Sequence, residues 1–600
     1  GDKVWILHGG KTNTLDAENV GRLPIEVSAL SVASGETRIT HPAGLAHCFP
    51  PVASSKFIFA GVFDMTDLET GEVVASRITK AHCSTENGWV PANGLIYTTP
   101  KHCTCWPLLR GYVALAPARP GAKTAVRDVG PIPCSLEAGE GGDLPHAAPE
   151  KFPGARGDTG NDWPMYRADA WRSGSTSGPG PRDLGVRWKA RLALAQDVTD
   201  SPGPVLQDCR ENPFVKGPLS APVVAGNMAY VARPDAHEII AVDASCGESK
   251  WRFTADGRVD TPPAIHRGLC IFGTHGGSVY ALRADSGTLV WRLKIGPHDE
   301  QIVAYGQLES PWPIPGAVLI SQSVAYFVAG RQSFADGGVI VAAVDPLTGK
   351  RQWMRRINTV PQEGYYESSA LEFDPVDILH REGDSIAMSR WVLSADGKNI
   401  RVDKWNAFAK LDTGAGAAWV PRGPWSYGAR HQQRFPGEPE RRPLVVFRDG
   451  AVFGALDGST ELFRRDFDEE GLAGFKSKWI TGWDAFKISR EGGKPYRSHR
   501  VAEGSKWTAD HFIPAAEKGK PIPPGTQLHN DIHALALAGD GRLFAVHRDG
   551  HVKTIRADDG SVLDETLISQ PIWDGLAIAG GHLYVTTQSG DLLCLGQTAR

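Results

Sequence analysis

The sequence lacks any apolar run of about 18 residues, the length that a helix needs to cross a bilayer, so we expect no membrane span. It also lacks a charge excess. The net charge of −4 offers no basic surface to a polyanion, which argues against nucleic-acid binding. Methionine is scarce, with 5 residues, whereas 68 glycines and 43 prolines mark many turns between short strands. This balance favours an all-β protein.

An internal repeat carries the fold prediction. Each copy has an apolar pair, a turn that ends in glycine, and a tryptophan four residues later. The three clear copies run from Ala241 to Gly247 with Trp251, from Ala281 to Gly287 with Trp291, and from Ala343 to Gly349 with Trp353. Weaker copies without the tryptophan occur at 29–35, 67–71 and 554–560. The glycine supplies a positive φ at the turn, and the indole ring can pack between neighbouring sheets.

The spacing of the repeat predicts a propeller. Trp251 and Trp291 are 40 residues apart, which is the length of one blade. We expect one all-β propeller domain over 1–600, with eight four-stranded blades and a ring that closes by pairing strands of 4–39 with 570–596. Seven or nine blades are the alternatives, because the repeat is hard to follow over 360–480. The blade-like units lie near 48–80, 83–119, 218–256, 260–296, 308–357, 373–403, 443–483, 529–566 and 570–596.

Three segments interrupt the repeat. Residues 120–162 are rich in proline and glycine, and we expect them to cross the surface without regular structure. Residues 405–440 and 485–527 are rich in Arg, Lys, Pro and Gly, and we expect them to form loop insertions on one face. Such insertions commonly build the binding surface of a repeat protein.

The segment from Asp162 to Thr176 (DWPMYRADAWRSGST) resembles the opening segment of many propeller proteins of Planctomycetes-type bacteria, called PQQ-binding-like β-propeller repeat proteins. The repeats themselves are similar to those of the PQQ-like superfamily, which includes the quinoprotein alcohol dehydrogenases and the outer-membrane assembly scaffold BamB. Further matching stretches are Arg258 to Pro263, Gly306 to Ser310, Ala329 to Gly338, and Pro91 to Tyr97. The resemblance implies a tryptophan-docking propeller but no activity, because the family name describes a fold.

The resemblance also raises the question of whether the protein binds the cofactor pyrroloquinoline quinone (PQQ). Dehydrogenases of the superfamily carry an adjacent cysteine pair, which stacks on the quinone, and a Glu/Asn/Asp calcium site. Here Thr104 separates Cys103 from Cys105, and no Cys-x-x-Cys-His haem motif occurs. PQQ is therefore disfavoured, and a divalent metal is the one cofactor that we keep under consideration.

The nine cysteines are concentrated near the start of the chain. Four of them fall within the first 105 residues, and three of these directly follow a histidine. Two disulfides in an oxidising compartment would explain the set, and we favour this interpretation, which indicates a secreted or periplasmic protein. The alternative is a zinc or copper site made by thiolates and imidazoles. The residues concerned are Cys48, Cys83, Cys103 and Cys105, with His47, His82 and His102.

One end of the central channel gathers polar residues, because the residues just before each innermost strand line it. Acids, imidazoles and guanidinium groups that converge there could form a catalytic site, in which a carboxylate or imidazole acts as general base and an arginine neutralises a substrate carboxylate. The alternative is a set of capping residues around a water-filled channel. The candidate catalytic residues are Asp260, Glu309, Arg331, His529, Asp531 and His533, and the candidate substrate-binding residues are Arg258, Gln307, Trp312, Tyr427, Trp573 and Asp574.

The densest polar segment runs from Leu528 to His533. Its two histidines, His529 and His533, alternate with Asp531 along one strand face, which suits a metal pair or an acid–base site. Exposed aromatic residues at the mouth could stack on sugar rings, although buried aromatics that brace loops are an alternative. We assign His266 and His275 to structural or surface positions.

Three functions follow from these features. The first is a secreted or periplasmic enzyme that acts on a polysaccharide, as a lyase or hydrolase, at the channel mouth. The second is a non-catalytic scaffold of the BamB type that binds a protein partner. The third is an oxidoreductase that depends on PQQ or a metal.

Overall fold

The computed structural model describes residues 2–9, 24–45, 51–60, 64–75, 89–98, 113–117, 132–142, 160–194, 217–296, 300–304, 307–330, 338–357, 379–388, 391–402, 408–412, 417–421, 445–455, 462–466, 505–512 and 532–597. In these ranges the regular structure is β-strand, apart from the short 3-10 turn η3 (Pro234–Ala236). No helix in the described part of the chain is long and apolar enough to span a bilayer. The all-β prediction is confirmed.

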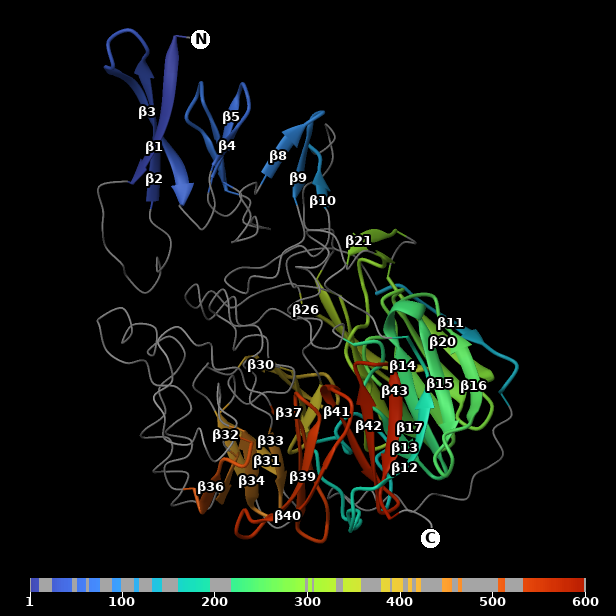
Figure 1. Ribbon diagram of the computed structural model, residues 1–600. Coiled ribbons are helices and arrows are strands. Elements are labelled where there is room, and N and C mark those ends of the chain that lie inside the picture. Colours follow the sequence, from blue (N-terminus) through green and yellow to red (C-terminus); the bar gives the residue numbers. More distant parts are fainter. Residues whose placement is uncertain are drawn as a thin grey trace.

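Seven antiparallel sheets, made by strands between residues 134 and 595, form the body of the described chain, six with four strands and one with five. Figure 1 shows several of them side by side. In chain order the strands are β11 (Cys134–Ala138), β12 (Val186–Arg191), β13 (Val223–Ala225), β14 (Met228–Arg233), β15 (Glu238–Asp243), β16 (Ser249–Thr254), β17 (Ala264–His266), β18 (Leu269–Gly273), β19 (Ser278–Arg283), β20 (Leu289–Ile295), β23 (Leu319–Ser321), β24 (Val324–Ala329), β25 (Val339–Val344), β26 (Arg351–Ile357), β27 (His380–Glu382), β28 (Ser385–Met388), β29 (Trp391–Ser394), β30 (Ile400–Val402), β33 (Val445–Arg448), β34 (Ala451–Ala455), β35 (Leu462–Asp466), β36 (Trp507–Ala509), β37 (Ile532–Leu537), β38 (Arg542–His547), β39 (His551–Arg556), β40 (Val562–Leu567), β41 (Pro571–Ala579), β42 (His582–Thr587) and β43 (Asp591–Leu595).

The innermost strands of neighbouring sheets lie next to one another. β41 contacts β13 and β37, β13 contacts β17, β17 contacts β23, and β33 contacts β37. The apolar core therefore lies between sheets rather than within one layer. For example, Ile240 of β15 and Val585 of β42 share one buried cluster, and Ala281 of β19 shares another with Phe327 of β24. This is the packing of a β-propeller.

Tryptophan side chains join neighbouring sheets. Trp251, on the outer strand β16, donates its indole N–H to the carbonyl of Ala284 in the next sheet at 2.9 Å. The hydrogen bond contributes roughly 1 kcal/mol, and burial of the ring adds to it. Further pairs of this kind are Trp188 with Ala244, Trp291 with Pro346, Trp353 with Ala395, and Trp507 with Ala557, at 2.9 to 3.0 Å. The expected role of the repeat tryptophan is confirmed.

The glycine of each docking turn makes room for the ring. Gly287 has φ +73°, and a Cβ atom at this position would stand 2.7 Å from the ring of Trp251. The hydroxyl of Tyr230 also donates to the carbonyl of Ala284, at 3.1 Å, so one carbonyl accepts two aromatic donors from the neighbouring sheet. A larger residue at the turn would remove this fit.

A short segment at residues 160–176, the inner belt, runs along the innermost strands. Trp163 and Val224 exchange two backbone hydrogen bonds, at 2.7 and 2.9 Å, which attach the belt to β13. The belt then reaches further sheets, because its carbonyl groups accept backbone N–H groups of Ile265 in β17, Arg381 in β27, Phe447 in β33 and Leu537 in β37. One continuous segment therefore ties the inner strands of five sheets together.

Arg172 of the inner belt links the belt to two further sheets. Its side chain is fully buried, and its guanidinium donates to the carbonyls of Tyr166 at 2.9 Å, Val318 at 3.2 Å and Leu379 at 3.1 Å. Val318 and Leu379 precede the innermost strands of two different sheets. A buried guanidinium is tolerated because carbonyl oxygens surround it.

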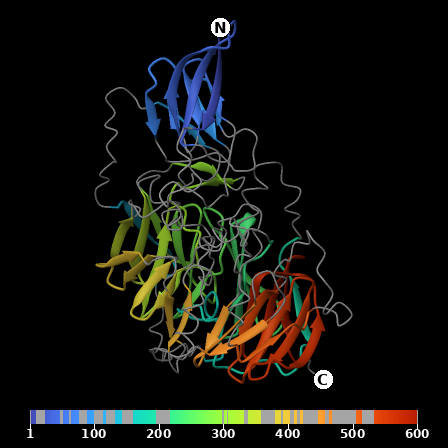
Figure 2. The same ribbon diagram turned by 90° about the vertical axis from the view of Figure 1, so that its left-hand side faces the viewer.

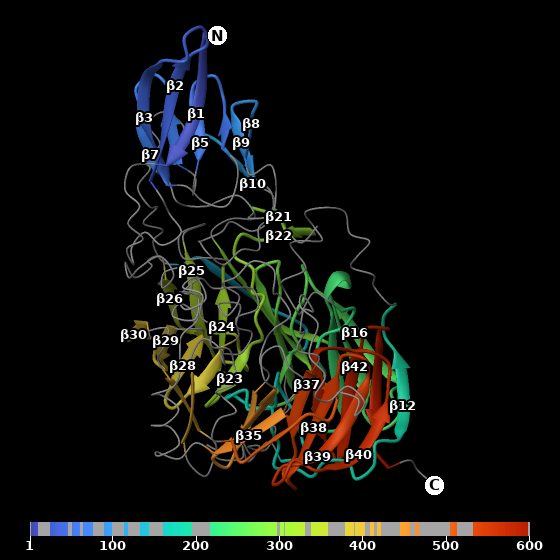
Figure 3. The same ribbon diagram turned by 60° about the vertical axis from the view of Figure 1, so that its left-hand side comes forward.

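Strands between residues 3 and 115 form three further sheets. In Figures 2 and 3 these strands stand together at one end, apart from the seven sheets. The strands are β1 (Lys3–Gly9), β2 (Pro24–Ser31), β3 (Thr37–Leu45), β4 (Val52–Ala53), β5 (Phe57–Ala60), β6 (Asp64–Asp67), β7 (Val73–Ala75), β8 (Trp89–Ala92), β9 (Leu95–Thr98) and β10 (Val113–Leu115). The units expected at 48–80 and 83–119 are thus strands, but they are not placed between the blades of the ring.

The expected pairing of residues 4–39 with the last repeat is wrong. β1 pairs with β2, and the outer strand of the last sheet is β12, which pairs with β43 from Val186 to Arg191. The eighth blade stays a prediction. The two-stranded pair β31 (Phe408–Asp412) and β32 (Ala417–Pro421) lies beside β27, where such a blade would be.

Strands also occur in segments that we expected to be irregular. β11 lies within 120–162 and adds a fifth strand to the outer edge of β20. β31 and β32 lie within 405–440, and β36, within 485–527, supplies the outer strand of the sheet that begins with β33. The physical reason is that each strand has a partner for its backbone groups: β20 for β11, β35 for β36, and β31 and β32 for each other.

The docking turn gives the first prediction. We expect Gly287→Ala to lower the free energy of unfolding more than Gly268→Ala does. Both glycines have φ between +73° and +78°, so both substitutions strain the backbone by about 1–2 kcal/mol. Only at Gly287 does the new methyl group also meet a docked indole, which adds about 1–3 kcal/mol of overpacking, whereas nothing lies within 4 Å of Gly268. Urea denaturation midpoints would measure the difference, and equal effects would contradict the docking role of the turn.

Candidate functional site

A buried chain of charges lies where the polypeptide passes from β16 to β17. Arg258 and Asp260 are on this connection, and the side chain of each is at most 2% exposed. The Nε of Arg258 donates to Asp260 Oδ1 at 3.0 Å, and a terminal nitrogen of the same guanidinium pairs with Asp235 Oδ1 at 2.8 Å. Asp235 is on η3, between β14 and β15. The arginine therefore bridges two acids from different loops.

His275, in the turn between β18 and β19, extends the chain of charges. Its Nε2 lies 2.9 Å from Asp260 Oδ2 and its Nδ1 lies 2.9 Å from Glu309 Oε1, with all three side chains fully buried. Burial disfavours the charged imidazole, but Glu309 and Asp260 outweigh it and raise the pKa of His275 to about 9. His275 is thus an imidazolium at neutral pH, held between two carboxylates.

The pKa of Asp260 moves in the opposite direction. Burial alone would raise it, but Arg258 and His275 together lower the pKa of this carboxyl well below its usual range. Asp260 is therefore a stable carboxylate that accepts hydrogen bonds. It is poorly suited to donate a proton as a general acid.

The network ends on a small hairpin. β21 (Ile302–Ala304) pairs with β22 (Gln307–Glu309), and Glu309 is the residue that contacts His275. The neighbouring Gln307 accepts a hydrogen bond from His237 Nε2 at 2.7 Å, and its amide nitrogen lies 3.4 Å from Asp235 Oδ1. Gln307 and Glu309, the first and third residues of β22, therefore hold the hairpin to the loops that carry His237 and His275.

The other side of this hairpin is apolar and exposed. Val303 of β21 and Leu308 of β22 are directly opposite each other in the pairing, so their side chains share one face. Val303 is 40% exposed and Leu308 is 59% exposed. A fixed hairpin thus presents two adjacent apolar side chains to solvent.

A second buried group joins the inner belt to β41. Arg167 pairs with Asp574 at 2.8 Å, and the hydroxyl of Tyr166 donates to the same carboxylate at 2.6 Å. Arg167 also donates to the carbonyl of Val445, at the start of β33. Burial first, and the negative charge of Asp574 second, raise the pKa of Tyr166 well above its ordinary value. The hydroxyl therefore stays protonated and acts as a donor.

Several predicted site residues do come together. The buried chain of charges includes four of them: Arg258, Asp260, Gln307 and Glu309. Arg258, Asp260 and Glu309 are buried, so they do not face an open channel. The alternative of hydrated acids around a water-filled channel does not hold for these residues. Their charges instead face one another across protein loops.

Other predicted residues have different surroundings. Trp312 is 6% exposed and packs in an apolar core cluster, so its ring is not presented for stacking on a sugar. Trp573 forms an edge-to-face contact with His533, with ring centroids 5.9 Å apart. Asp574 belongs to the second buried group. The remaining candidates, Arg331, Tyr427, His529, Asp531, Cys103 and Cys105, lie outside the described residues.

The sequence reasoning missed the central residue of the network. We assigned His275 to structural or surface positions; it is fully buried between two acids, so the structural assignment holds, but its pairing with Asp260 and Glu309 and the membership of Asp235 and His237 were not foreseen. The available signal was Arg258-Val-Asp260. A charged pair spaced by two residues in a loop rich in apolar residues needs further partners once it is buried.

The described cysteines are free thiols. Cys134 and Cys246 are exposed, and Cys270 and Cys594 are buried. Burial raises the pKa of Cys594 to about 11, and that of Cys270 also rises. The set formed by Cys48, Cys83, Cys103 and Cys105 lies outside the described residues, so its disulfide and metal interpretations both stay predictions.

Comparison with known proteins supports the same superfamily. Residues 169–377 match the family described as "Outer membrane protein assembly factor BamB". The quinoprotein alcohol dehydrogenase PedH of Pseudomonas putida is 26% identical over 149 residues, which are 23% of this chain and 23% of that enzyme. The chain thus matches about a quarter of the length of this curated relative.

Solved structures with a similar arrangement share little sequence with this chain. BamB from Moraxella catarrhalis is 13% identical, with 62% of this chain and 81% of that chain covered and a TM-score of 0.30. A quinohemoprotein alcohol dehydrogenase from Pseudomonas putida is 14% identical, with 73% and 81% covered and a TM-score of 0.39.

The imidazolium of His275 predicts a pH dependence. Its pKa is about 9 in the folded protein and about 6.5 in the unfolded chain. A raised pKa contributes stability that is fully present below about pH 6.5 and is lost as the pH rises to about 9. The contribution is on the order of 3 kcal/mol. We expect the urea midpoint to fall between pH 6.5 and pH 9.

The variant His275→Gln provides the control. Glutamine retains hydrogen-bonding groups but does not titrate, and it leaves two buried carboxylates without a cation between them. The variant should be about 3–5 kcal/mol less stable than the natural protein at pH 6.5 and should lose most of the decline toward pH 9. An undiminished decline in the variant would assign the pH dependence to other groups.

Proposed function

This chain is a member of the PQQ-like repeat superfamily of β-propellers, which includes BamB-type proteins and quinoprotein dehydrogenases, and we propose from this premise that it is a non-catalytic protein-binding scaffold. Its partner would dock on the β21–β22 hairpin. The matching family is described as an assembly factor, which supports this class of function. The carrying observation is a firmly held hairpin whose outer face is apolar.

The hairpin has the properties of a docking anchor. Val303 and Leu308 form an adjacent apolar pair, and the buried bond from Glu309 to His275 together with the bond from Gln307 to His237 fixes the strand that carries them. An anchor that is ordered before binding loses little conformational entropy when the partner arrives. Apolar anchors at the centre of an interface commonly contribute most of the binding energy.

Action on a polysaccharide is the enzymatic alternative. A lyase or hydrolase would need Asp260 or Glu309 within hydrogen-bond reach of the polymer. Both side chains are fully buried and bonded to His275, so catalysis would require the network to open. This alternative therefore has less support than a scaffold, and a panel of glycans incubated with the whole protein would test it.

The oxidoreductase alternative is supported by the partial match to a quinoprotein alcohol dehydrogenase. The residues present do not fit PQQ. The chain has no adjacent cysteine pair, which is the feature that stacks on the quinone in dehydrogenases of the superfamily. We expect the protein to bind no quinone when PQQ and Ca²⁺ are added.

A secreted or periplasmic location belongs to the same proposal. Its support is the description of the matching family as an outer-membrane assembly factor. A partner in that compartment would be a protein with an apolar side chain that covers Val303 and Leu308.

Substitution of the anchor tests the scaffold. We expect Leu308→Asp to reduce the affinity for the partner by at least tenfold, because a charge would be buried in an apolar contact. The partner would be identified by cross-linking from position 308 in cells that produce the protein naturally, and its affinity for the purified whole chain would then be measured by calorimetry.

The matched control is Leu567→Asp on β40. This leucine is 64% exposed, comparable with Leu308, but it lies on an outer strand of a different sheet. The control should bind like the natural protein, and both variants should keep its unfolding midpoint. Equal affinity of the Leu308 variant and the natural protein would overturn the docking site, and turnover of a glycan or an alcohol would overturn the scaffold.

A further inference from the structure

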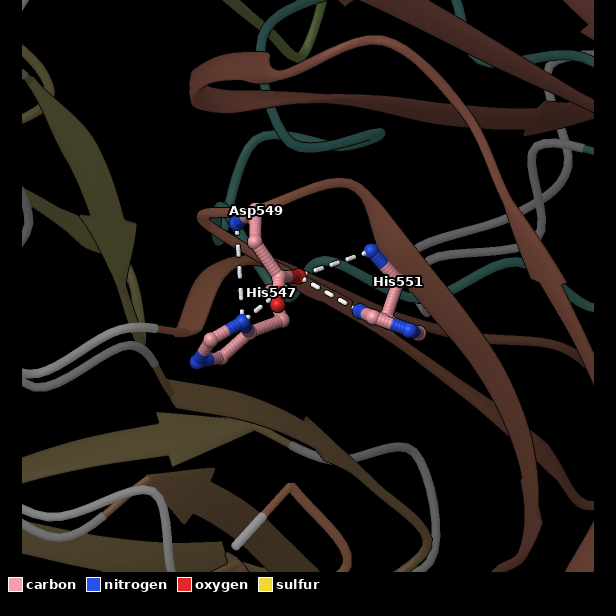
Figure 4. Close-up of side chains that lie close together, drawn as sticks. All are labelled: His547, Asp549 and His551. Atoms are coloured by element: carbon pink, nitrogen blue, oxygen red, sulfur yellow. Dashed lines mark hydrogen bonds and ion pairs between the residues drawn. The ribbon is translucent and has the colours of Figure 1, made fainter. Parts of the chain in front are cut away.

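The turn between β38 and β39 brings together two histidines and an aspartate (Figure 4). His547 ends β38, Asp549 lies in the turn and His551 begins β39. The Oδ1 atom of Asp549 is 2.7 Å from Nδ1 of His547 and 2.8 Å from Nδ1 of His551. One nitrogen from each imidazole and one carboxylate oxygen all lie within 4.8 Å of one another.

This convergence is a property of the turn. In three sheets the turn spans five residues, in which the fourth residue is a glycine whose N–H donates to the carbonyl of the first. In each case the carbonyl of that glycine accepts a backbone N–H from the last residue of a neighbouring strand or from the residue that follows this strand. The donors are Ile295, Ile568 and Leu192. The three turns are 274–278, 547–551 and 587–591.

The turn at 587–591 shows what the geometry does to alternate side chains. Its first and third residues, Thr587 and Ser589, are hydrogen-bonded at 2.9 Å, and Ser589 donates to the fifth, Asp591, at 2.6 Å. The first, third and fifth side chains therefore meet at one point. At 547–551 the same three positions carry His, Asp and His, which are metal ligands rather than simple hydrogen-bonding groups.

We propose that His547, Asp549 and His551 form a binding site for a divalent transition-metal ion of the zinc class. Two imidazole nitrogens and one carboxylate oxygen are a ligand set that such ions prefer, whereas Ca²⁺ and Mg²⁺ prefer sites made of oxygen atoms. Three protein ligands leave at least one coordination position for water or for a group from another molecule.

Neighbouring residues hold one of the three ligands in place and leave the other two accessible to solvent. The ring of Phe512 stacks on His547 with centroids 5.0 Å apart, and the His547 side chain is only 13% exposed, so this imidazole is fixed. Asp549 and His551 are about half exposed, so an ion can reach them directly from solvent. The amide N–H of His551 donates to Asp549 Oδ1 at 3.0 Å, which holds the carboxylate beside both imidazoles.

The site differs from the metal pair that the sequence suggested. His533 contacts Trp573, and His529 lies outside the described residues. The proposed metal site is far from the docking hairpin in the sequence. Its turn connects the second and third strands of a sheet, as the turn of His275 does, and equivalent turns lie on the same face of a propeller. The metal site therefore lies on the same face as the turn of His275.

Calorimetric titration of the whole chain with Zn²⁺, after treatment with a chelator, tests the proposal. We expect one ion to bind per chain, and we expect Asp549→Asn and His551→Ala each to weaken binding by about 10- to 100-fold or more, since even outer-shell changes have effects of this size. Ca²⁺ and Mg²⁺ should not compete at similar concentrations. The matched control is His8→Ala, which removes an exposed histidine that lies 3.8 Å from Glu26, and it should bind like the natural protein.

X-ray absorption of the zinc-loaded protein separates this site from the cysteines. Nitrogen and oxygen neighbours at about 2.0 Å would support the proposal, whereas sulfur neighbours at about 2.3 Å would place the ion on thiolates and overturn it. Absence of zinc binding, or binding of the same affinity in both variants, would also overturn it. Unfolding midpoints of the metal-free variants confirm that each is folded.

Discussion

The contact on which the ring depends is an indole that docks on a turn of the next sheet. Each tryptophan that takes part sits on an outer strand, donates to a turn carbonyl and requires a glycine beneath its ring, as Trp251 does with Ala284 and Gly287. Because the donor and the acceptor belong to different sheets, no sheet can satisfy the contact alone. Stability is therefore shared between neighbours, and the apolar core is divided into clusters that each span adjacent sheets.

The inner belt adds a second constraint. It links the inner strands of several sheets, whereas each docked tryptophan links an outer part of one sheet to its neighbour. The backbone of the belt bonds with the inner strands of five sheets, and the buried side chains of Arg172 and Arg167 add hydrogen bonds to carbonyl and carboxylate groups of further sheets. With polar groups sealed inside, the features left for recognition lie at the surface. Within the described residues, the β21–β22 hairpin presents an exposed apolar pair and the turn at 547–551 presents a cluster of metal-ligand side chains.

Much of the fold could be predicted from the sequence, because the docking turn is local. A glycine with positive φ and a tryptophan four residues later are both visible in the chain, and the blade positions followed from them. The site could not be predicted in the same way. His275 acquires its role from Asp260 and Glu309, which lie 15 and 34 residues away, and only the packing of three loops decides that all are buried. The strand β12 was missed for a related reason, since its partner β43 is about 400 residues away in the sequence.

The pairing of β12 with β43 can form only after the ribosome has made β43, the last strand in the described part of the chain. Arg191 and Asp591, which are bonded across these two strands, are 400 residues apart in the chain. At about 5–20 residues per second, a ribosome needs on the order of 20–80 s to produce the partner after it has produced the first strand. During this time the outer face of β12 and the first part of the inner belt have no last sheet to pack against. A chain released early, at any point before the final strands, would keep that edge open and available to other polypeptides.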